Sequence, residues 1–188
     1  MTSAAALHPR RARVAVDVRT SGAVTLRQAA PEDARAIHDL IARHLDEGHL
    51  LPRQLGEISV HAHRFVVAVD GGEIVGCADL APLSRTVAEV RSLVVSRQAR
   101  SSGAGGRLVD ALVARAARSG FERLCAFTHA PAYFVRLGFS IVPHEWLPEK
   151  ISTDCGSCAM FRRCGQYAVM FSLIGARQSC VPLASLHG

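Results

Sequence analysis

Two neighbouring runs specify the architecture of this 188-residue chain, EVRSLVV at residues 89–95 and RSSGAGGR at residues 100–107. The first is apolar and the length of a strand, and the second opens a helix whose apolar residues recur at helical spacing over 103–120. Glycines let a backbone approach its ligand closely, and the free amides at a helix start attract phosphate. The unit therefore predicts a pyrophosphate site, although an ordinary glycine–serine connection would have the same composition. It matches neither the dinucleotide-binding nor the P-loop pattern.

Regular elements surround this unit. A glycine pair at 71–72 favours a hairpin, and an acidic first turn at 31–33 favours a helix start. Hydrophobic spacing and turn residues predict strands over 24–27, 64–70, 73–81, 89–95, 123–127, 139–142 and 167–173, and helices over 31–45, 103–120 and 132–137, with a short helix ending near 63. Strands and helices interspersed in this way indicate a mixed α/β fold with one central sheet.

Composition excludes several classes of protein. With 49% apolar and 20% charged residues the chain should fold, and no apolar run is long enough for a membrane helix. The net charge is +6, but the first 22 residues supply half of it, with four arginines against one aspartate. The positive charge on the rest of the chain fits a small anionic ligand at least as well as nucleic acid. We therefore expect no nucleic-acid or membrane partner. We also expect a cytoplasmic protein, because the N-terminal segment lacks the apolar stretch of a secretory signal.

Two motifs in the predicted domain resemble those of the GNAT superfamily of acetyltransferases. One is Arg-x-x-Gly-x-Gly at residues 100–105, and the other is YFVRLGF at residues 133–139. The resemblance covers 24 to about 173 and implies an α/β (α+β) fold whose mostly antiparallel sheet splays between the fourth and fifth strands, with helices on both faces. We expect a flexible basic extension over 1–22, the acetyltransferase domain over 23–174 with a cysteine cluster at 155–164, and a C-terminal tail over 175–188.

The same resemblance implies that acetyl-CoA lies in the gap between the splayed strands. In that arrangement the backbone at positions 93 and 95 pairs with the pantetheine arm. The acetyl-CoA-binding residues that it implies are Leu93, Val94, Val95, Arg100, Ser101, Ser102, Gly103, Ala104, Gly105, Gly106 and Phe134.

Four segments and the cysteine cluster are similar to the stand-alone N-acetylglutamate synthase type of amino-acid acetyltransferase: residues 49–53, 89–93, 128–134 and 147–150. No amino-acid kinase domain precedes the motifs, which suits the single-domain form. The resemblance implies acetyl transfer to the α-amine of L-glutamate by direct attack in a ternary complex, the first step of arginine biosynthesis. Two alternatives stay open: another acceptor, such as another amino acid, a small amine or a protein N-terminus, or a non-catalytic module that binds acetyl-CoA or metal.

Acetyl transfer to an amine needs a base, an oxyanion donor and a proton for the thiolate. We expect Glu89 to be the base, which is also the position that the resemblance implies, and a backbone N–H near Leu93 or Val94 to be the donor. Many GNAT enzymes have tyrosine where this chain has Phe134, while its own tyrosine is one residue earlier. A one-residue shift turns a helical side chain by about 100°, so Tyr133 is a weak acid candidate, and water or the product ammonium can protonate the thiolate instead.

A dicarboxylate acceptor calls for fixed cations, and arginine matches a carboxylate with two parallel hydrogen bonds. Arg53 and Arg91 are the expected pair, with Lys150 as a third cation. Ser92 and Thr128 complete the predicted acceptor-binding set.

Cysteines Cys155, Cys158 and Cys164 fall within ten residues and include a Cys-x-x-Cys, a recurrent half of a zinc site. A structural zinc needs four ligands, and His144 is the only obvious local fourth. A disulfide, a redox switch or simple packing would also explain the cluster. GNAT proteins often dimerise, so the resemblance allows a homodimer.

Overall fold

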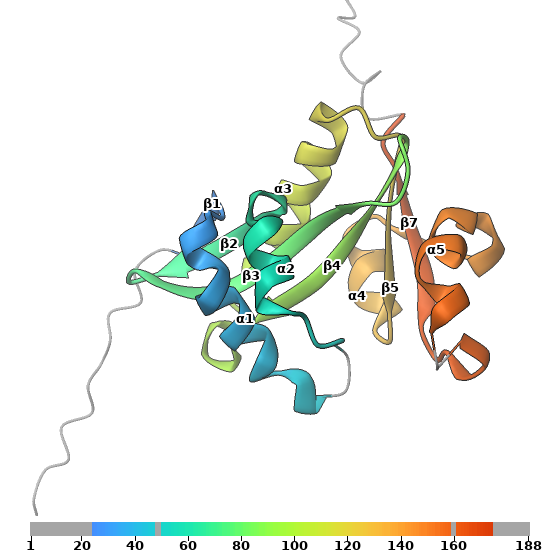
Figure 1. Ribbon diagram of the computed structural model, residues 1–188. Helices are drawn as coiled ribbons and strands as arrows, with labels where there is room; N and C mark the ends of the chain where they lie inside the picture. The colour runs from blue at the N-terminus through green and yellow to red at the C-terminus, as the bar shows by residue number, and fades with distance from the viewer. Residues whose placement is uncertain (1–23, 48–49, 159–160, 175–188) are drawn as a thin grey trace, which may run out of the picture.

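The computed structural model describes residues 24–47, 50–158 and 161–174, and these form a single seven-stranded sheet with helices on both faces (Figure 1). The strand order is β1-β2-β3-β4-β5-β7-β6. The strands are β1 (Thr25–Gln28), β2 (Phe65–Asp70), β3 (Glu73–Pro82), β4 (Val87–Val95), β5 (Arg123–Thr128), β6 (Ser140–Val142) and β7 (Tyr167–Ser172). The helices are α1 (Ala34–Ala42), α2 (Leu55–Val60), α3 (Ala104–Arg118), α4 (Pro131–Arg136) and α5 (Pro148–Thr153).

The split in the sheet lies between β4 and β5, as predicted. These two strands are parallel and pair over only three positions, the last of which joins Glu89 to Cys125. All other neighbours in the sheet are antiparallel. Beyond Glu89, β4 keeps its pairing with β3 while β5 keeps its pairing with β7, so the two strands diverge into a V (Figure 1).

Two apolar layers hold helices against the sheet. On one face α3 buries Leu108, Val109 and Leu112 completely against β2, β3 and β4. On the other face α1 does the same with Ile37 and Leu40. Each such side chain contributes about 1.5–3 kcal/mol by leaving water. The helix that carries the glycine loop is therefore anchored along one side for its whole length.

Strand β4 carries a bulge at Ser92. Its φ is +50°, which is uncommon for a residue with a side chain, and the register with β3 shifts between Cys77 and Asp79. The Cys77 thiol donates to the Ser92 carbonyl at 3.5 Å. Bulges re-aim neighbouring side chains, and this one separates the charged part of β4, with Glu89 and Arg91, from its apolar end.

The predicted extension over 1–22 and tail over 175–188 lie outside the described residues, so their separation from the domain stays a prediction. Each helix in the described part of the chain is too short or too polar to cross a membrane.

Candidate active site

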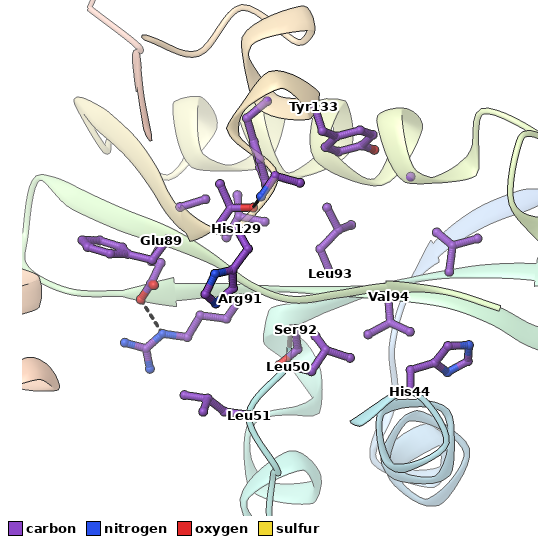
Figure 2. A pocket seen from close by; sticks show the side chains of 18 of the residues that line it. His44, Leu50, Leu51, Glu89, Arg91, Ser92, Leu93, Val94, His129 and Tyr133 are labelled. Atoms are coloured by element: carbon purple, nitrogen blue, oxygen red, sulfur yellow. Dashed lines mark hydrogen bonds and ion pairs between the residues drawn. The ribbon is translucent and has the colours of Figure 1, made fainter. Parts of the chain in front are cut away.

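A cavity of about 850 Å³ follows β4 from Glu89 to the glycine loop. Its floor is β4, and its walls come from the segment before α2, the end of β5, α4 and α5. The side chains of β4 alternate along it: Leu93 points toward Tyr133 on α4, whereas Val94 points toward His44 (Figure 2). One end of the cavity is bounded by backbone and the other by charged side chains. We call these the donor end and the acceptor end.

The donor end is formed where the glycine loop enters α3. Ser101 and Gly103 have φ of +70° and +79°, so the chain turns sharply, and the N-cap residue Gly103 has no side chain with which to cap the helix. The Ser102 hydroxyl accepts from the Ala104 amide at 3.3 Å. The first amides of α3 have no partner inside the helix. Predicted acetyl-CoA residues line this end: Leu93, Val94, Val95, Arg100, Ser101, Gly103, Ala104, Gly105, Gly106 and Phe134. Ser102 is the exception, since its hydroxyl donates to the Ala99 carbonyl at 2.7 Å and does not line the cavity.

Tyr133 closes over the start of α3. A Cβ placed on Gly105 would lie 2.6 Å from the Tyr133 hydroxyl oxygen, so only glycine leaves room for this ring. Burial raises the pKa of Tyr133, which keeps the hydroxyl protonated. Phe134 is buried against Phe139, with ring centroids 5.2 Å apart. The tyrosine thus lines the cavity and also packs against the apolar core.

Arg100 of the glycine loop has a protein carboxylate as its partner. Glu47 accepts from Arg100 at 2.6 and 2.9 Å and from Arg97 at 3.1 Å. The hydrogen bond from Arg100 is the main cause of the lowered pKa of Glu47. This contact could not be predicted from the sequence, because some fifty residues separate its partners.

The acceptor end is centred on Glu89, whose carboxylate is almost entirely buried. Arg91 Nε donates to Oε2 at 2.5 Å (Figure 2), and Lys150 Nζ lies 2.8 Å from Oε1 and 2.9 Å from Oε2. The predicted base is therefore held by two of the three predicted acceptor-binding cations.

Asp154 completes a ring of four charges. It accepts from Lys150 Nζ at 2.8 Å and from Arg91 Nη2 in a short contact. The lysine ammonium also lies 5.3 Å from the centroid of the Phe127 ring. Burial opposes charge on Arg91, but the carboxylates of Glu89 and Asp154 outweigh it and raise the pKa of the guanidinium.

Arg53 reaches the acceptor end from the other side. It donates to Glu57 at 2.7 and 3.2 Å, to the Ser92 hydroxyl at 3.2 Å and to Asp79 at 3.5 Å. Asp79 is 1% exposed, and its Oδ1 has no hydrogen-bond partner among the described residues. Burial raises the pKa of Asp79 in spite of Arg53. Sequence reasoning missed Asp79, although a lone aspartate within the apolar strand β3 was a usable signal.

All five predicted acceptor-binding residues line the cavity: Arg53, Arg91, Ser92, Thr128 and Lys150. The Thr128 hydroxyl accepts from the Ala130 amide at 3.0 Å, so part of its role is to shape the turn into α4.

The cysteine cluster does not form the predicted metal site. Cys155 is half-buried, while Cys158 and Cys164 are exposed, and all three are free thiols. Within residues 24–47, 50–158 and 161–174, no group of three histidine, cysteine or acidic side chains is placed to hold a metal. His144 instead bonds to the Gln166 carbonyl at 3.0 Å. The spacing matched a zinc half-site, but the thiols do not converge with further ligands.

Comparisons with known proteins agree with this geometry. The acetyltransferase (GNAT) family model matches residues 27–139. An uncharacterized N-acetyltransferase of Chlorobaculum tepidum is 31% identical over 148 residues, which are 79% of this chain and 96% of that protein. An amino-acid acetyltransferase of Neisseria meningitidis serogroup B is 32% identical over 133 residues, which are 70% of this chain but only 30% of that protein.

Solved structures give the same picture. N-acetylglutamate synthase of Neisseria gonorrhoeae, complexed with coenzyme A and N-acetyl-glutamate, superposes with a TM-score of 0.72 at 28% identity, over 80% of this chain and 35% of that one. A Mycobacterium tuberculosis protein in complex with CoA and NLQ has a TM-score of 0.69 at 22% identity, over 79% and 98%, and supports the fold alone.

Proposed function

This chain belongs to the acetyltransferase (GNAT) family, and from that premise we propose that it transfers acetyl from acetyl-CoA to the α-amine of L-glutamate. The observation that carries the proposal is a single cavity with helix-start amides at one end and, at the other, a buried carboxylate held by two cations with Arg53 nearby. Relatives named amino-acid acetyltransferase argue against the alternative of a non-catalytic module. Those relatives are about three times as long as the matched region, so their activity enters here as a proposal.

The donor end fits acetyl-CoA. The start of α3, after Gly103, supplies amides for a pyrophosphate, with Arg100 beside it. The β4 edge that β5 leaves unpaired supplies backbone groups for the amides of the pantetheine arm. The relative from Neisseria gonorrhoeae was solved with coenzyme A, which supports the same placement.

The acceptor end fits the proton transfer that the reaction requires. Near neutral pH an α-amine is largely protonated, so Glu89 accepts a proton from it directly or through one water. The neutral nitrogen then attacks the thioester carbonyl, and the C–N bond forms as the C–S bond breaks. The proton that the attacking nitrogen loses passes to the departing thiolate, directly or through one water, and Glu89 returns its own proton to solvent. A β4 amide near Leu93 or Val94 stabilises the developing oxyanion. In the free protein Arg91 and Lys150 hold the Glu89 carboxylate, so the acceptor amine has to take the place of at least one of them.

Arg53 selects the second carboxylate of the acceptor in this proposal. Because Glu57 and Asp79 already balance its charge, an amino acid with a neutral polar side chain is the second candidate acceptor. We further propose that the reaction takes place in the cytoplasm and supplies arginine biosynthesis.

The test is CoA-thiol release from acetyl-CoA by the purified, reduced protein with each common amino acid as acceptor. We expect turnover with L-glutamate, and loss of most of it in Arg53→Ala and Arg91→Ala. Arg35→Ala is the matched control, since Arg35 is exposed on α1 and, in the part of the chain that the structure describes, pairs with Asp39 on the same helix. Turnover with another amino acid would replace glutamate but keep the reaction. Failure of every amino acid would refute the proposed class of acceptor.

A further inference from the structure

Helix α5 and the residue after it present an ammonium and a carboxylate side by side. Lys150 and Asp154 are four positions apart, which places them on the same side of one helical turn, and their Nζ and Oδ2 atoms are 2.8 Å apart. These are the two charged groups that every α-amino acid carries.

Each group lies where the corresponding group of an acceptor would be needed. The Lys150 ammonium touches both oxygens of Glu89, the proposed base, and sits over the Phe127 ring. The Asp154 carboxylate touches Arg91 Nη2, while Arg91 Nε holds Glu89. Glu89 and Arg91 therefore already bind one ammonium and one carboxylate, both supplied by α5 and the residue that follows it.

We propose that the Lys150–Asp154 pair occupies the amino-acid site of the free protein, and that the acceptor binds by exchange, with its ammonium on Glu89 and its α-carboxylate on Arg91. The inference rests on the proposed function for the class of acceptor. It goes further by assigning the orientation of that acceptor and by making Asp154 a determinant of its affinity.

Exchange suits the charges of this pocket. Glu89 is 4% and Arg91 25% exposed, so leaving either without a counter-charge would be costly. A zwitterion that replaces another zwitterion keeps both paired throughout. Asp154, at 34% exposed, is the most accessible of the four groups, and water can solvate its carboxylate once it is displaced.

The exchange needs side-chain movement only. Glu149 on the same helix is paired to Arg123 of β5 at 2.8 Å, and this contact lies outside the cavity. Leu147, at the start of α5, is completely buried and fixes the helix to the sheet while Lys150 and Asp154 turn away. Glu149 therefore provides a matched control for Asp154.

The Lys150–Asp154 pair competes with the acceptor for its site. The measured Kd is therefore the intrinsic Kd divided by the fraction of molecules whose site is open. If the pair fills the site nine-tenths of the time, the measured Kd is about ten times the intrinsic value. Removing the charge of Asp154 releases Arg91 and should tighten acceptor binding by about threefold to tenfold.

The experiment is calorimetric titration of the CoA-loaded protein with L-glutamate, comparing wild type, Asp154→Asn and Glu149→Gln. The steady-state KM for L-glutamate is measured in parallel. We expect a lower Kd and a lower KM in Asp154→Asn and no change in Glu149→Gln. Asp154→Ser gives the same test if the asparagine variant is poorly folded.

Unchanged or weaker binding in Asp154→Asn would overturn the inference, because Asp154 would then be a structural residue or a direct ligand of the acceptor. If the wild type turns over another amino acid in place of L-glutamate, only the proposed substrate fails, and that amino acid replaces it in the titration with the same expected result. If no amino acid binds or reacts, the proposed function and the inference both fail.

Discussion

The donor end of the cavity is built from backbone within one short stretch, whereas the acceptor end is built from side chains of four separated segments. Residues 93–106 supply most of the donor end. The acceptor end needs Arg53, Asp79, the 89–92 region and the 150–154 region, and each charge there has a partner of opposite sign. A ligand shared by a whole family can be bound by local geometry, while the acceptor is selected by charges that only folding brings together.

The largest effect is expected from crowding the backbone-built end. Gly105→Ala sets a Cβ 2.6 Å from the Tyr133 hydroxyl, and overpacking of this kind costs about 1–3 kcal/mol. If the strain falls on the bound state, acetyl-CoA binding weakens by roughly tenfold to a hundredfold. Titration with acetyl-CoA measures it.

Tyr133→Phe in the same chain should restore most of that binding, because the next atom of the ring is 3.6 Å from the added Cβ. Gly56→Ala, with open space around it, is the control. A double variant as weak as Gly105→Ala alone would show that the clash is not with the hydroxyl.

The second effect concerns the charge-built end. Arg91→Lys keeps a cation but cannot hold Glu89 and Asp154 at once, and a hydrogen bond between charged groups contributes about 1.5–3 kcal/mol. We expect the KM for the acceptor to rise about tenfold and the KM for acetyl-CoA to stay within about twofold. Arg123→Lys, which alters an ion pair outside the cavity, should leave both unchanged. An equal rise in both KM values would mean that the two ends are not independent.

A third prediction concerns stability at the acceptor end. The folded-state pKa of Asp79 lies above its ordinary 3.8, so above that pH the folded protein binds more protons at this site than the unfolded chain. This contribution to the free energy of unfolding therefore falls as the pH rises from about 3.8 through the folded-state pKa. Asp79→Asn removes this titration. As the pH rises, we expect the free energy of unfolding of the variant to increase relative to that of the wild type, by an amount on the order of 1 kcal/mol.

Urea unfolding at a series of pH values measures the difference. Asp39→Asn is the opposing control. Hydrogen bonds from His38 and Arg35 lower the pKa of Asp39, so its ionised carboxylate stabilises the folded state once the pH is above its ordinary pKa of 3.8. If the wild type instead becomes more stable relative to Asp79→Asn as the pH rises, the pKa of Asp79 is not raised in the folded protein.

The prediction with the smallest expected effect concerns the buried cysteines near Glu89, where β4 and β5 begin to separate. Burial raises the pKa of Cys77 and Cys125 to about 12, so at pH 8 about one molecule in ten thousand carries either thiolate. Brief treatment of the native protein with iodoacetamide should label Cys158 and Cys164, which are exposed, and spare the buried pair. Peptide mass spectrometry identifies the sites, and urea-unfolded protein is the control. Labelling of Cys125 would show that β4 and β5 separate at Glu89 as well as beyond it.

The regular elements could be predicted wherever the signal was local. The predicted helix over 103–120 is α3 (Ala104–Arg118), and the predicted hairpin strands over 64–70 and 73–81 are β2 and β3 to within a residue. Helix α5 was not predicted, because six residues are too few for a hydrophobic period. The place of β7 between β5 and β6 could not be predicted either, since a non-local pairing leaves no mark on a short strand.

The site followed the same division. The predicted glycine-loop residues line the cavity apart from Ser102, because helix-start geometry depends on consecutive residues. Their binding of acetyl-CoA stays a prediction. On the acceptor side the sequence pointed to the cations but missed Asp79, Asp154 and Glu57, which balance them. Nothing in the spacing of a lone carboxylate says which arginine it will meet.

Where β4 and β5 diverge, the interior of this sheet has two strand edges without a neighbouring strand, as the outer edge of a sheet has. Past Glu89 each strand keeps one hydrogen-bonded neighbour, so a row of amides and carbonyls faces the cavity from both sides. Unpaired strand edges are templates on which other chains add. In the proposed function coenzyme A would lie between these edges as a surrogate strand, and we expect the protein emptied of it to be the form that aggregates on concentration and storage.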